Sequence, residues 1–241
     1  MLRTLRLGVL TPSSNTALEP LISALAAEVP GCSAHFSRFK VTEIGLNASA
    51  LAQFDERNIL AAAELLADAK VDVIGWSGTS SGWLGFDADR RLVERIREHT
   101  GIAATTAVLS LNELLALGGV ERLALVTPYS ADVQQRIVDN YRALGVEVVA
   151  ERHLDITVNH DFALVAPDRL QALVREVAAA RPQAIATYCT NLRAAQLADA
   201  VESELDIPLL DTVSTTFWGQ LRAAGADPAQ LRGWGRLFQW R

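Results

Sequence analysis

A cysteine at the end of a predicted strand is the residue in this sequence best placed to do chemistry. Cys189 is followed by the polar residues Thr190 and Asn191, and we predict that a helix begins near residue 192. The dipole at a helix N-terminus lowers a thiol pKa by stabilising the thiolate. A buried cysteine is often only a small apolar side chain, and Cys32, in a predicted turn, fits that description. Because the neighbours of Cys189 are polar, we predict that Cys189 is catalytic.

Two short patterns recur in the same order along the chain. Residues 9–14 and 125–130 both contain Thr-Pro-x-Ser, and residues 74–79 and 185–190 share a second pattern that ends in small polar residues. One such match can arise by chance, but two matches in the same order indicate an internal repeat. Each half therefore has one strand that ends in Thr-Pro and another that ends in a small polar cluster.

Short apolar runs of strand length alternate with longer helical patterns along the whole chain. The predicted strands cover residues 5–11, 34–41, 71–77, 102–105, 122–127, 146–152, 184–189 and 208–210. The predicted helices cover residues 17–28, 49–69, 87–99 with Asp87 as N-cap, a segment ending near 117, 131–144, 167–180, about 192–205 and a last helix ending at 224. Strands separated by helices of this length are typical of crossover units in parallel sheets.

The repeat and the alternation together predict an α/β fold of two pseudo-symmetric, doubly wound lobes. Each lobe would hold a parallel sheet flanked by helices, and the active site would lie in the cleft between the lobes. We predict an N-terminal lobe over residues 1–118 and a C-terminal lobe over residues 119–206. The segment from about 207 to 241 would pack back on the N-terminal lobe.

Four predicted loops follow the carboxyl ends of strands, where ligands bind in open parallel sheets. They span residues 12–16, 77–82, 128–131 and 189–191, and they carry hydroxyls, amides and backbone N–H groups next to helix starts. Such groups can hold a carboxylate without any lysine or arginine. Each of them could instead only cap a helix, but four loops that all serve merely as caps are a weaker explanation.

Composition excludes several other classes of function. The net charge of −6 argues against a nucleic-acid binder, and no apolar run is long enough to span a membrane. Lys40 and Lys70 are the only lysines, which disfavours pyridoxal phosphate, and no glycine-rich nucleotide-binding loop follows a strand. His153 and His160 could form a metal site with Asp155 and Asp161, but polar residues of a solvated loop are the better explanation. Two distant cysteines make no disulfide framework. We expect a cytoplasmic protein that has no metal, cofactor, nucleic-acid or membrane partner.

Several motifs resemble the aspartate/glutamate racemase superfamily, and within it the branch of arylmalonate decarboxylases and maleate cis-trans isomerases. The motifs are Leu10-Thr11-Pro12-Ser13-Ser14-Asn15-Thr16, Gly78-Thr79-Ser80, Pro128-Tyr129, Cys189 and Gly233-Trp234-Gly235-Arg236-Leu237-Phe238. The resemblance runs from end to end of the chain. It implies a cofactor-free enzyme with catalytic groups that face one another across the cleft between two lobes.

This sequence departs from the racemases and isomerases that it resembles, which usually present one cysteine from each half. Gly78 stands where the first-half cysteine is expected, so neither a two-base racemase nor the thiol nucleophile of a maleate isomerase is complete. One cysteine together with Gly-Thr-Ser instead resembles arylmalonate decarboxylase. The resemblance then implies that Thr79, Ser80, Tyr129 and the backbone near Thr190 hold a carboxylate that becomes an enediolate as carbon dioxide leaves.

We therefore predict a cofactor-independent carbon–carbon lyase that decarboxylates an arylmalonate-like acid, with protonation of one face by Cys189. The predicted substrate-binding residues are Ser13, Asn15, Gly78, Thr79, Ser80, Tyr129, Asn159 and Thr190. Asn15 and Asn159 match the isomerase branch, so an isomerase of maleate or a racemase of the aspartate/glutamate type remains an alternative. A non-catalytic carboxylate-binding protein is a second alternative. The ligand would be a small mono- or dicarboxylic acid, and the sequence leaves open whether the chain forms a homo-oligomer.

Overall fold

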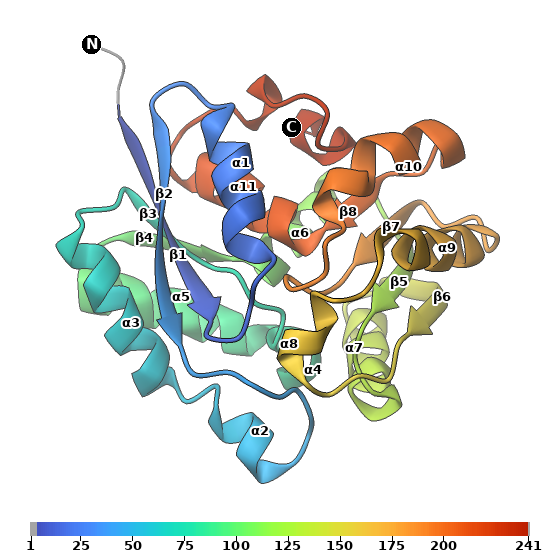
Figure 1. The fold of residues 1–241 in the computed structure, drawn as a ribbon, viewed down its shortest axis with the longest axis horizontal. Coiled ribbons are helices and arrows are strands. Elements are labelled where there is room, and N and C mark those ends of the chain that lie inside the picture. Colours follow the sequence, from blue (N-terminus) through green and yellow to red (C-terminus); the bar gives the residue numbers. More distant parts are fainter. Residues whose placement is uncertain (1–3, 241) are drawn as a thin grey trace.

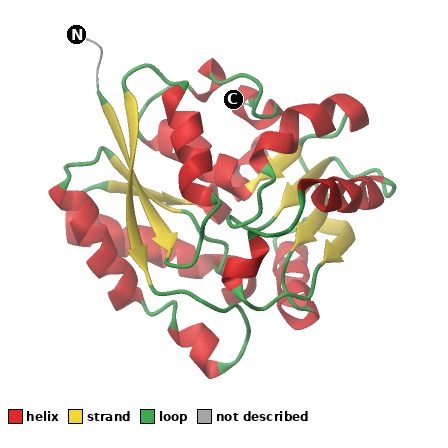
Figure 2. Ribbon diagram, viewed as in Figure 1, coloured by secondary structure: helices red, strands yellow, loops and turns green. Residues whose placement is uncertain are grey.

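The strands of the computed structural model, which describes residues 4–240, form two parallel sheets of four strands each (Figures 1 and 2). The first sheet has the order β2-β1-β3-β4, with β1 Leu5–Pro12, β2 Cys32–Phe39, β3 Val73–Trp76 and β4 Ala103–Thr106. The second has the order β6-β5-β7-β8, with β5 Arg122–Thr127, β6 Glu147–His153, β7 Ala184–Thr187 and β8 Leu209–Asp211. Every pair of neighbouring strands is parallel, so each connection crosses the sheet through helical segments.

Helices connect these strands and cover the faces of both sheets (Figure 2). The α-helices are α1 Leu18–Ala27, α2 Ala48–Ala52, α3 Glu56–Asp68, α4 Ser81–Leu84, α5 Phe86–Thr100, α6 Ala107–Leu117, α7 Ala131–Ala143, α8 Asn159–Phe162, α9 Pro167–Ala178, α10 Ala198–Leu205 and α11 Thr212–Ala223. The short 3-10 helices are η1 Ala195–Leu197, η2 Pro228–Gln230 and η3 Arg236–Gln239. The predicted α/β class is thereby confirmed.

Equivalent backbone hydrogen bonds in the two halves show that the halves are pseudo-symmetric. The backbone N–H of Ser77 donates to the carbonyl of Leu10 at 3.2 Å, and the N–H of Tyr188 donates to the carbonyl of Val126 at 2.9 Å. These donors each directly follow the third strand of their half in chain order, β3 or β7. Gly78 and Cys189 therefore occupy equivalent positions, two residues beyond the ends of those strands. The prediction of two pseudo-symmetric lobes is confirmed.

The core is most deeply buried where β3, β7 and α11 lie. All four residues of β3 and of β7 are buried, as are the first ten residues of α11. Helix α11 contacts α6, β4, β3 and α1, whereas β8, just before it, pairs with β7 in the second sheet. The chain therefore reaches the first sheet only after β8, slightly later than residue 207. The division into lobes at residues 118 and 206 stays a prediction.

Three predicted helix boundaries were wrong, and each has a local cause. The helix predicted over 49–69 is two helices, because the Asp55 side chain accepts a hydrogen bond from the N–H of Arg57 at 2.9 Å and starts α3 anew. Helix α5 begins after Gly85, whose φ is +94°, so Asp87 lies in the first turn and is not the N-cap. Residues 189–194 do not form the start of the helix predicted from about 192, since α10 begins at Ala198 after η1.

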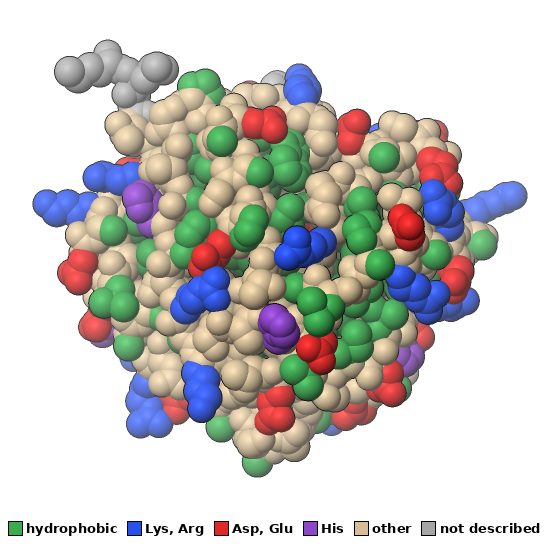
Figure 3. Space-filling view, in the orientation of Figure 1, with side chains coloured by type: hydrophobic (Ala, Val, Ile, Leu, Met, Phe, Trp, Pro, Cys, Tyr) green, Lys and Arg blue, Asp and Glu red, His purple; other side chains and the backbone are tan. Residues whose placement is uncertain are grey.

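Charged side chains of both signs are interspersed on the face shown in Figure 3. Half-exposed ion pairs such as Arg175–Glu204 and Arg152–Glu176, each with an N–O distance of 2.7 Å, join neighbouring elements of the second lobe. Such pairs contribute little individually, because water screens them. Within residues 4–240 no helix has the length and apolar character needed to cross a membrane.

A buried carboxyl group at the end of β8 makes the stability of the fold depend on pH. Asp211 accepts hydrogen bonds from the Thr187 hydroxyl at 2.8 Å and from the N–H of Val213 at 2.9 Å, and burial raises its pKa from 3.8 to about 7. Because the folded state holds this proton more tightly, the stabilisation is complete below about pH 4 and is lost as the pH rises toward 7.

We expect Asp211→Asn, which keeps the side chain's shape, to remove this dependence. Between pH 5 and pH 8 the free energy of unfolding should fall by about 2–3 kcal/mol less in the variant than in the wild type. Urea denaturation at the two pH values measures this difference. Asp206→Asn, at a side chain that is 91% exposed, is the matched control and should leave the pH dependence unchanged. Parallel wild-type and Asp211→Asn curves would contradict the prediction.

Candidate functional site

A small cavity lies where strands of both sheets end. Its apolar wall consists of Pro12, Val41, Ile44, Phe54, Trp76 and Trp83, and its polar wall consists of Gly78, Thr79, Ser80, Tyr129, Asn159, Cys189 and Thr190. The cavity volume is about 20 Å³, room for roughly one water molecule. A carboxylic acid is larger, so binding requires the walls to move apart.

Seven of the nine residues predicted for the site line this cavity, and all four predicted loops contribute to it. The two exceptions are Ser13 and Asn15. The segment after β2, which supplies Val41, Ile44 and Phe54 to the cavity wall, was not among the predicted site segments. A signal for it existed, because β2 is also a parallel strand whose carboxyl end lies at the same edge as the other strand ends.

The two lobes are joined beside the cavity by buried side-chain amides. The amide nitrogen of Asn15 donates to the carbonyl and hydroxyl of Thr190 at 3.2 and 3.3 Å, and its oxygen accepts from the N–H groups of Ala17 and Leu18. The oxygen of Asn191 accepts from the N–H of Ala17 at 3.2 Å, across the lobe boundary. Asn15 thus links the lobes and caps α1. Its predicted role as a donor to a substrate carboxylate stays a prediction.

The segment after β2 is fastened to the second lobe above the cavity. The N–H of Ile44 donates to the carbonyl of Thr157, and the N–H of Asn159 donates to the carbonyl of Thr42, both at 2.9 Å. The Asn159 amide also donates to the Ser14 hydroxyl at 2.8 Å. Ser13, outside the cavity wall, exchanges hydrogen bonds with the backbone of Val41. These bonds hold the apolar wall closed over the polar one.

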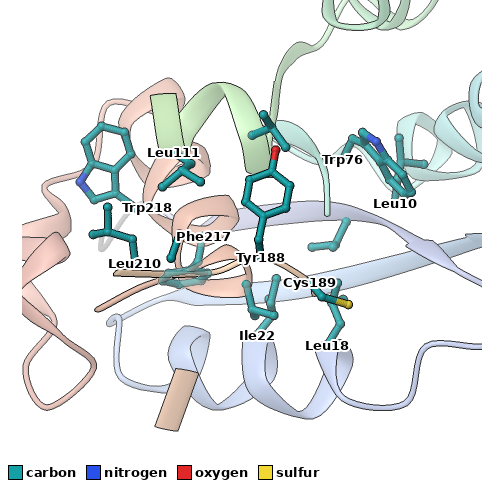
Figure 4. Packing of buried hydrophobic residues seen from close by; sticks show 14 of the residues in the cluster. Leu10, Leu18, Ile22, Trp76, Leu111, Tyr188, Cys189, Leu210, Phe217 and Trp218 are labelled. Carbon is teal, nitrogen blue, oxygen red and sulfur yellow. The ribbon is translucent and has the colours of Figure 1, made fainter. Parts of the chain in front are cut away.

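The thiol of Cys189 is buried, and only 3% of the residue is exposed. Burial raises its pKa to about 12, although the N–H of Asn191 donates to the sulfur at 3.4 Å and favours the thiolate. The expectation that a helix dipole lowers this pKa was therefore wrong, because α10 begins nine residues later and desolvation dominates. In Figure 4 the sulfur of Cys189 and the ring of Tyr188 extend to different sides of the chain. At neutral pH the thiol of Cys189 is therefore protonated.

Tyr129 and Thr79 bring hydroxyls from the two lobes together, with their oxygens 2.6 Å apart. Burial, reinforced by the neighbouring Cys189 thiol, holds the pKa of Tyr129 well above its usual value, so the phenol is protonated. The Tyr129 ring packs edge-on against Trp83 and against Phe162, with ring centroids 5.3 and 5.7 Å apart. Tyr129 is thus a rigid, neutral hydrogen-bond donor next to the thiol.

Gly78 is glycine because the indole of Trp76 occupies the space of a side chain there. A Cβ built at position 78 lies 2.0 Å from Cζ2 and 2.5 Å from Cε2 of Trp76. Trp76 is itself fixed by its place at the end of β3 and by the ring of Phe39, whose centroid is 5.0 Å away. A cysteine at position 78 does not fit beside Trp76 in this arrangement. The cavity wall therefore holds one thiol.

The described lining of the cavity contains no lysine, arginine or histidine, so every donor there is neutral. Within residues 4–240, no cluster of three or more His, Cys, Asp and Glu side chains is arranged to hold a metal ion. A larger groove of about 520 Å³ lies elsewhere, between Arg90 of α5, Leu109 of α6 and Leu144 after α7. None of the predicted site residues lines it.

Comparison with known proteins places these features in a family. A family model described as arylmalonate decarboxylase matches residues 19–238. The arylmalonate decarboxylase of Bordetella bronchiseptica is 32% identical over 170 residues, which cover 69% of this chain and 70% of that protein.

Solved structures of maleate isomerases are also similar. The isomerase Iso from Pseudomonas putida S16, crystallised with maleate as a cysteine-to-alanine mutant, shares 26% identity at a TM-score of 0.91, covering 99% of this chain and 98% of that one. The Nocardia farcinica maleate cis-trans isomerase shares the fold at 22% identity and a TM-score of 0.91, covering 99% of this chain and 100% of that one. That structure is a cysteine-to-serine mutant with a covalently bound succinylcysteine intermediate.

The overlap between position 78 and Trp76 predicts a coupled pair of substitutions. We expect Gly78→Ala to lower the free energy of unfolding by about 1–3 kcal/mol, since overpacking forces the indole or the backbone to shift. Adding Trp76→Leu should remove much of that effect, so that the double variant is more stable than the sum of the single changes predicts. Urea denaturation of all four proteins gives the coupling energy.

Gly45→Ala is the matched control for the single substitution. A Cβ at position 45 meets its nearest neighbour, the Asn47 amide nitrogen, at 3.4 Å, an ordinary contact distance. Its effect on stability should therefore be smaller than that of Gly78→Ala. Additive effects of Gly78→Ala and Trp76→Leu would show that the indole does not determine the residue at position 78.

Proposed function

The chain belongs to the arylmalonate decarboxylase family, and from its site we propose that it decarboxylates an arylmalonate-like acid without a cofactor. The observation that carries this proposal is a single buried thiol in the cavity wall, whose equivalent position in the other lobe is reserved for glycine by the Trp76 indole. A thiol with a pKa of about 12 can give up a proton to a carbanion, but it is a poor source of thiolate at neutral pH.

The polar wall supplies donors for the carboxylate that remains on the product. The hydroxyls of Thr79 and Tyr129, with Ser80 and the backbone at Thr190, are neutral donors grouped in the cavity wall. When the carbon–carbon bond to the departing carboxylate breaks, carbon dioxide leaves. The electron pair of that bond stays on the α-carbon and converts the retained carboxylate into an enediolate. Hydrogen bonds that strengthen as negative charge develops on the enediolate lower the activation barrier of the decarboxylation.

Cys189 completes the reaction by donating its proton to the α-carbon, and water then returns a proton to the thiolate. Because the other thiol of the chain, Cys32, is outside the cavity lining, only one face of the enediolate receives a proton from sulfur. The product is therefore a single enantiomer when the α-carbon carries three other different groups. The apolar wall, which includes Val41, Ile44 and Phe54, favours loss of charge from the departing carboxylate.

Maleate isomerisation is the second candidate, and a specific observation favours it. The similar isomerase structures superpose on this chain at a TM-score of 0.91, whereas arylmalonate decarboxylase structures of nearly the same coverage superpose at TM-scores of 0.78 to 0.85. In one of them a cysteine other than the substituted one carries the covalent succinyl group. This chain has no second thiol in the cavity lining, so an isomerase here would have to use Cys189 with a partner other than cysteine.

Turnover by a single thiol is tested with phenylmalonate, methylphenylmalonate, maleate and aspartate in deuterated buffer. We expect carbon dioxide from the arylmalonates and one deuterium on one face of the methylphenylmalonate product, measured by gas release and by NMR. Cys189→Ala should lower the rate at least about a hundredfold. Cys32→Ala is the matched control and should keep the wild-type rate.

Other outcomes of the same panel identify the alternatives. Conversion of maleate to fumarate would establish the isomerase, and deuterium on both faces would establish a racemase. Saturable binding of a diacid without turnover, unchanged in Cys189→Ala, would establish a non-catalytic carboxylate-binding protein.

The pH dependence of the rate separates a thiol acid from a thiolate. With a pKa of about 12, Cys189 stays protonated throughout the range from pH 7 to pH 10, so we expect kcat of the decarboxylation to be flat there. It should fall only when the thiol begins to lose its proton at higher pH. A rate that rises about tenfold per pH unit would instead show that the reactive form is the thiolate, contrary to this proposal.

A further inference from the structure

Asn191, two residues after the thiol, is held by hydrogen bonds to two distant segments of the chain. The residue is 1% exposed. Its side-chain oxygen accepts from the N–H groups of Thr16 and Ala17 at 3.0 and 3.2 Å, at the start of α1. Its side-chain nitrogen donates to the carbonyl of Asn159. Both polar atoms of the amide are therefore paired, and these bonds fix the turn that carries the thiol relative to the other lobe.

The backbone N–H of Asn191 is directed at the sulfur of Cys189, which accepts it at 3.4 Å. The turn is closed by the N–H of Leu192, which donates to the carbonyl of Cys189 at 3.2 Å. Residues 189–194 are not helical, so the bonds of the Asn191 side chain, rather than a helical backbone, hold this N–H in place. Burial raises the pKa of the thiol, and among the groups that lower this pKa the N–H of Asn191 has the largest effect.

The equivalent position in the first lobe holds a serine. Residues 78–80 take the place in their lobe that residues 189–191 take in the other, so Ser80 corresponds to Asn191. Ser80 lines the cavity, whereas Asn191 is outside its lining. The fold therefore accommodates a serine in this turn, and the asparagine stands in the lobe that carries the thiol.

We propose that Asn191 is a positioning residue for the proton transfer from Cys189, because its side chain holds its own backbone N–H against the sulfur. This assignment rests on the proposed function and extends it to a residue outside the cavity wall. In the transfer the S–H bond breaks and its electron pair stays on sulfur, while the proton forms a C–H bond with the electron pair on the α-carbon of the enediolate. The hydrogen bond to sulfur strengthens as the thiolate forms, and it thereby lowers the barrier of this step.

Alkylation by iodoacetamide tests the effect on the thiol without any substrate. In the Cys32→Ala protein Cys189 is the one remaining thiol. Asn191→Ser, added to it, should slow alkylation at pH 9 about tenfold, as for a thiol pKa raised by about one unit. A merely structural role predicts the opposite change, since a loosened lobe boundary would admit the reagent faster.

Asn15→Ser is the matched control for alkylation. Asn15 is also a buried asparagine with a hydrogen bond across the lobe boundary, but its amide donates to Thr190 and not to the sulfur. A serine at position 15 can still cap α1. This change should therefore leave the alkylation rate unchanged or raise it.

Turnover of methylphenylmalonate separates positioning from binding. Asn191→Ser should lower kcat about tenfold and change KM less than about threefold. The product should contain at least about a tenth of the second enantiomer, because water then competes with the slower thiol for the enediolate. Chiral chromatography of the product measures this fraction. A structural role would instead raise KM and leave a single enantiomer.

An NMR measurement with Asn191 intact keeps the proposal testable if Asn191→Ser does not fold. Residues 190–191 are the sole Thr-Asn pair in the sequence, so threonine labelled with carbon-13 at the carbonyl and asparagine labelled with nitrogen-15 select this N–H alone. Cys189→Ala removes the acceptor and should move the N–H proton signal upfield. Cys189→Ser, whose hydroxyl can still accept, should move it less.

Three results would each overturn the positioning role while the proposed function stands. They are alkylation of Asn191→Ser as fast as in its parent, a product that stays a single enantiomer in that variant, and an Asn191 N–H signal that does not move in Cys189→Ala. If the wild-type protein releases no carbon dioxide from any arylmalonate, the proposed function fails. The alkylation rates and the NMR signal then decide by themselves whether Asn191 controls the thiol.

Discussion

The hydrogen bonds between the lobes, made by the amides of Asn15 and Asn191, are the constraint on which the site depends. Each lobe contributes only part of the polar wall, so the polar wall is incomplete unless the strand ends of the two sheets are held in register. Asn15 donates to Thr190 and caps α1 with the same amide, which ties the first strand end of one lobe to the third of the other. Because these groups are buried, leaving one of them unpaired would cost about 1–3 kcal/mol. The register of the lobes is therefore strongly determined.

Within that frame, the packing of Trp76 decides how many acid/base groups the cleft contains. The pseudo-symmetry gives position 78 the same place in its lobe as position 189 has in the other lobe. The indole of Trp76 fills the space of a side chain at position 78. The glycine is thus a consequence of a neighbouring bulky residue, and the asymmetry of the chemistry follows from packing.

The sequence predicted the α/β class and the repeat because these depend on periodicity and on residues close together in the chain. The same patterns located the four loops that reach the cavity. The position of β2 could have indicated that the segment after it reaches the same edge, but nothing in the residues of that segment shows that Val41 and Phe54 form the apolar wall. The sequence also could not predict the pKa of Cys189, because this pKa depends on how completely distant segments exclude water from the thiol. The sequence showed Gly78, but the contact with Trp76 that explains it required coordinates.

The absence of cationic side chains from the described cavity lining fits the proposed decarboxylation better than a charged clamp would. An arginine or lysine would hold both carboxylates of a diacid strongly in the ground state, and that stabilisation would be lost as one of them becomes carbon dioxide. Neutral donors such as the Tyr129 phenol and the backbone N–H groups interact with charge as it develops and do not require a counter-ion afterwards. Burial keeps both the Tyr129 phenol and the Cys189 thiol protonated, so neither group adds negative charge to the cavity. In the proposed reaction the site therefore stabilises negative charge with neutral donors and keeps a proton on Cys189 that can neutralise it.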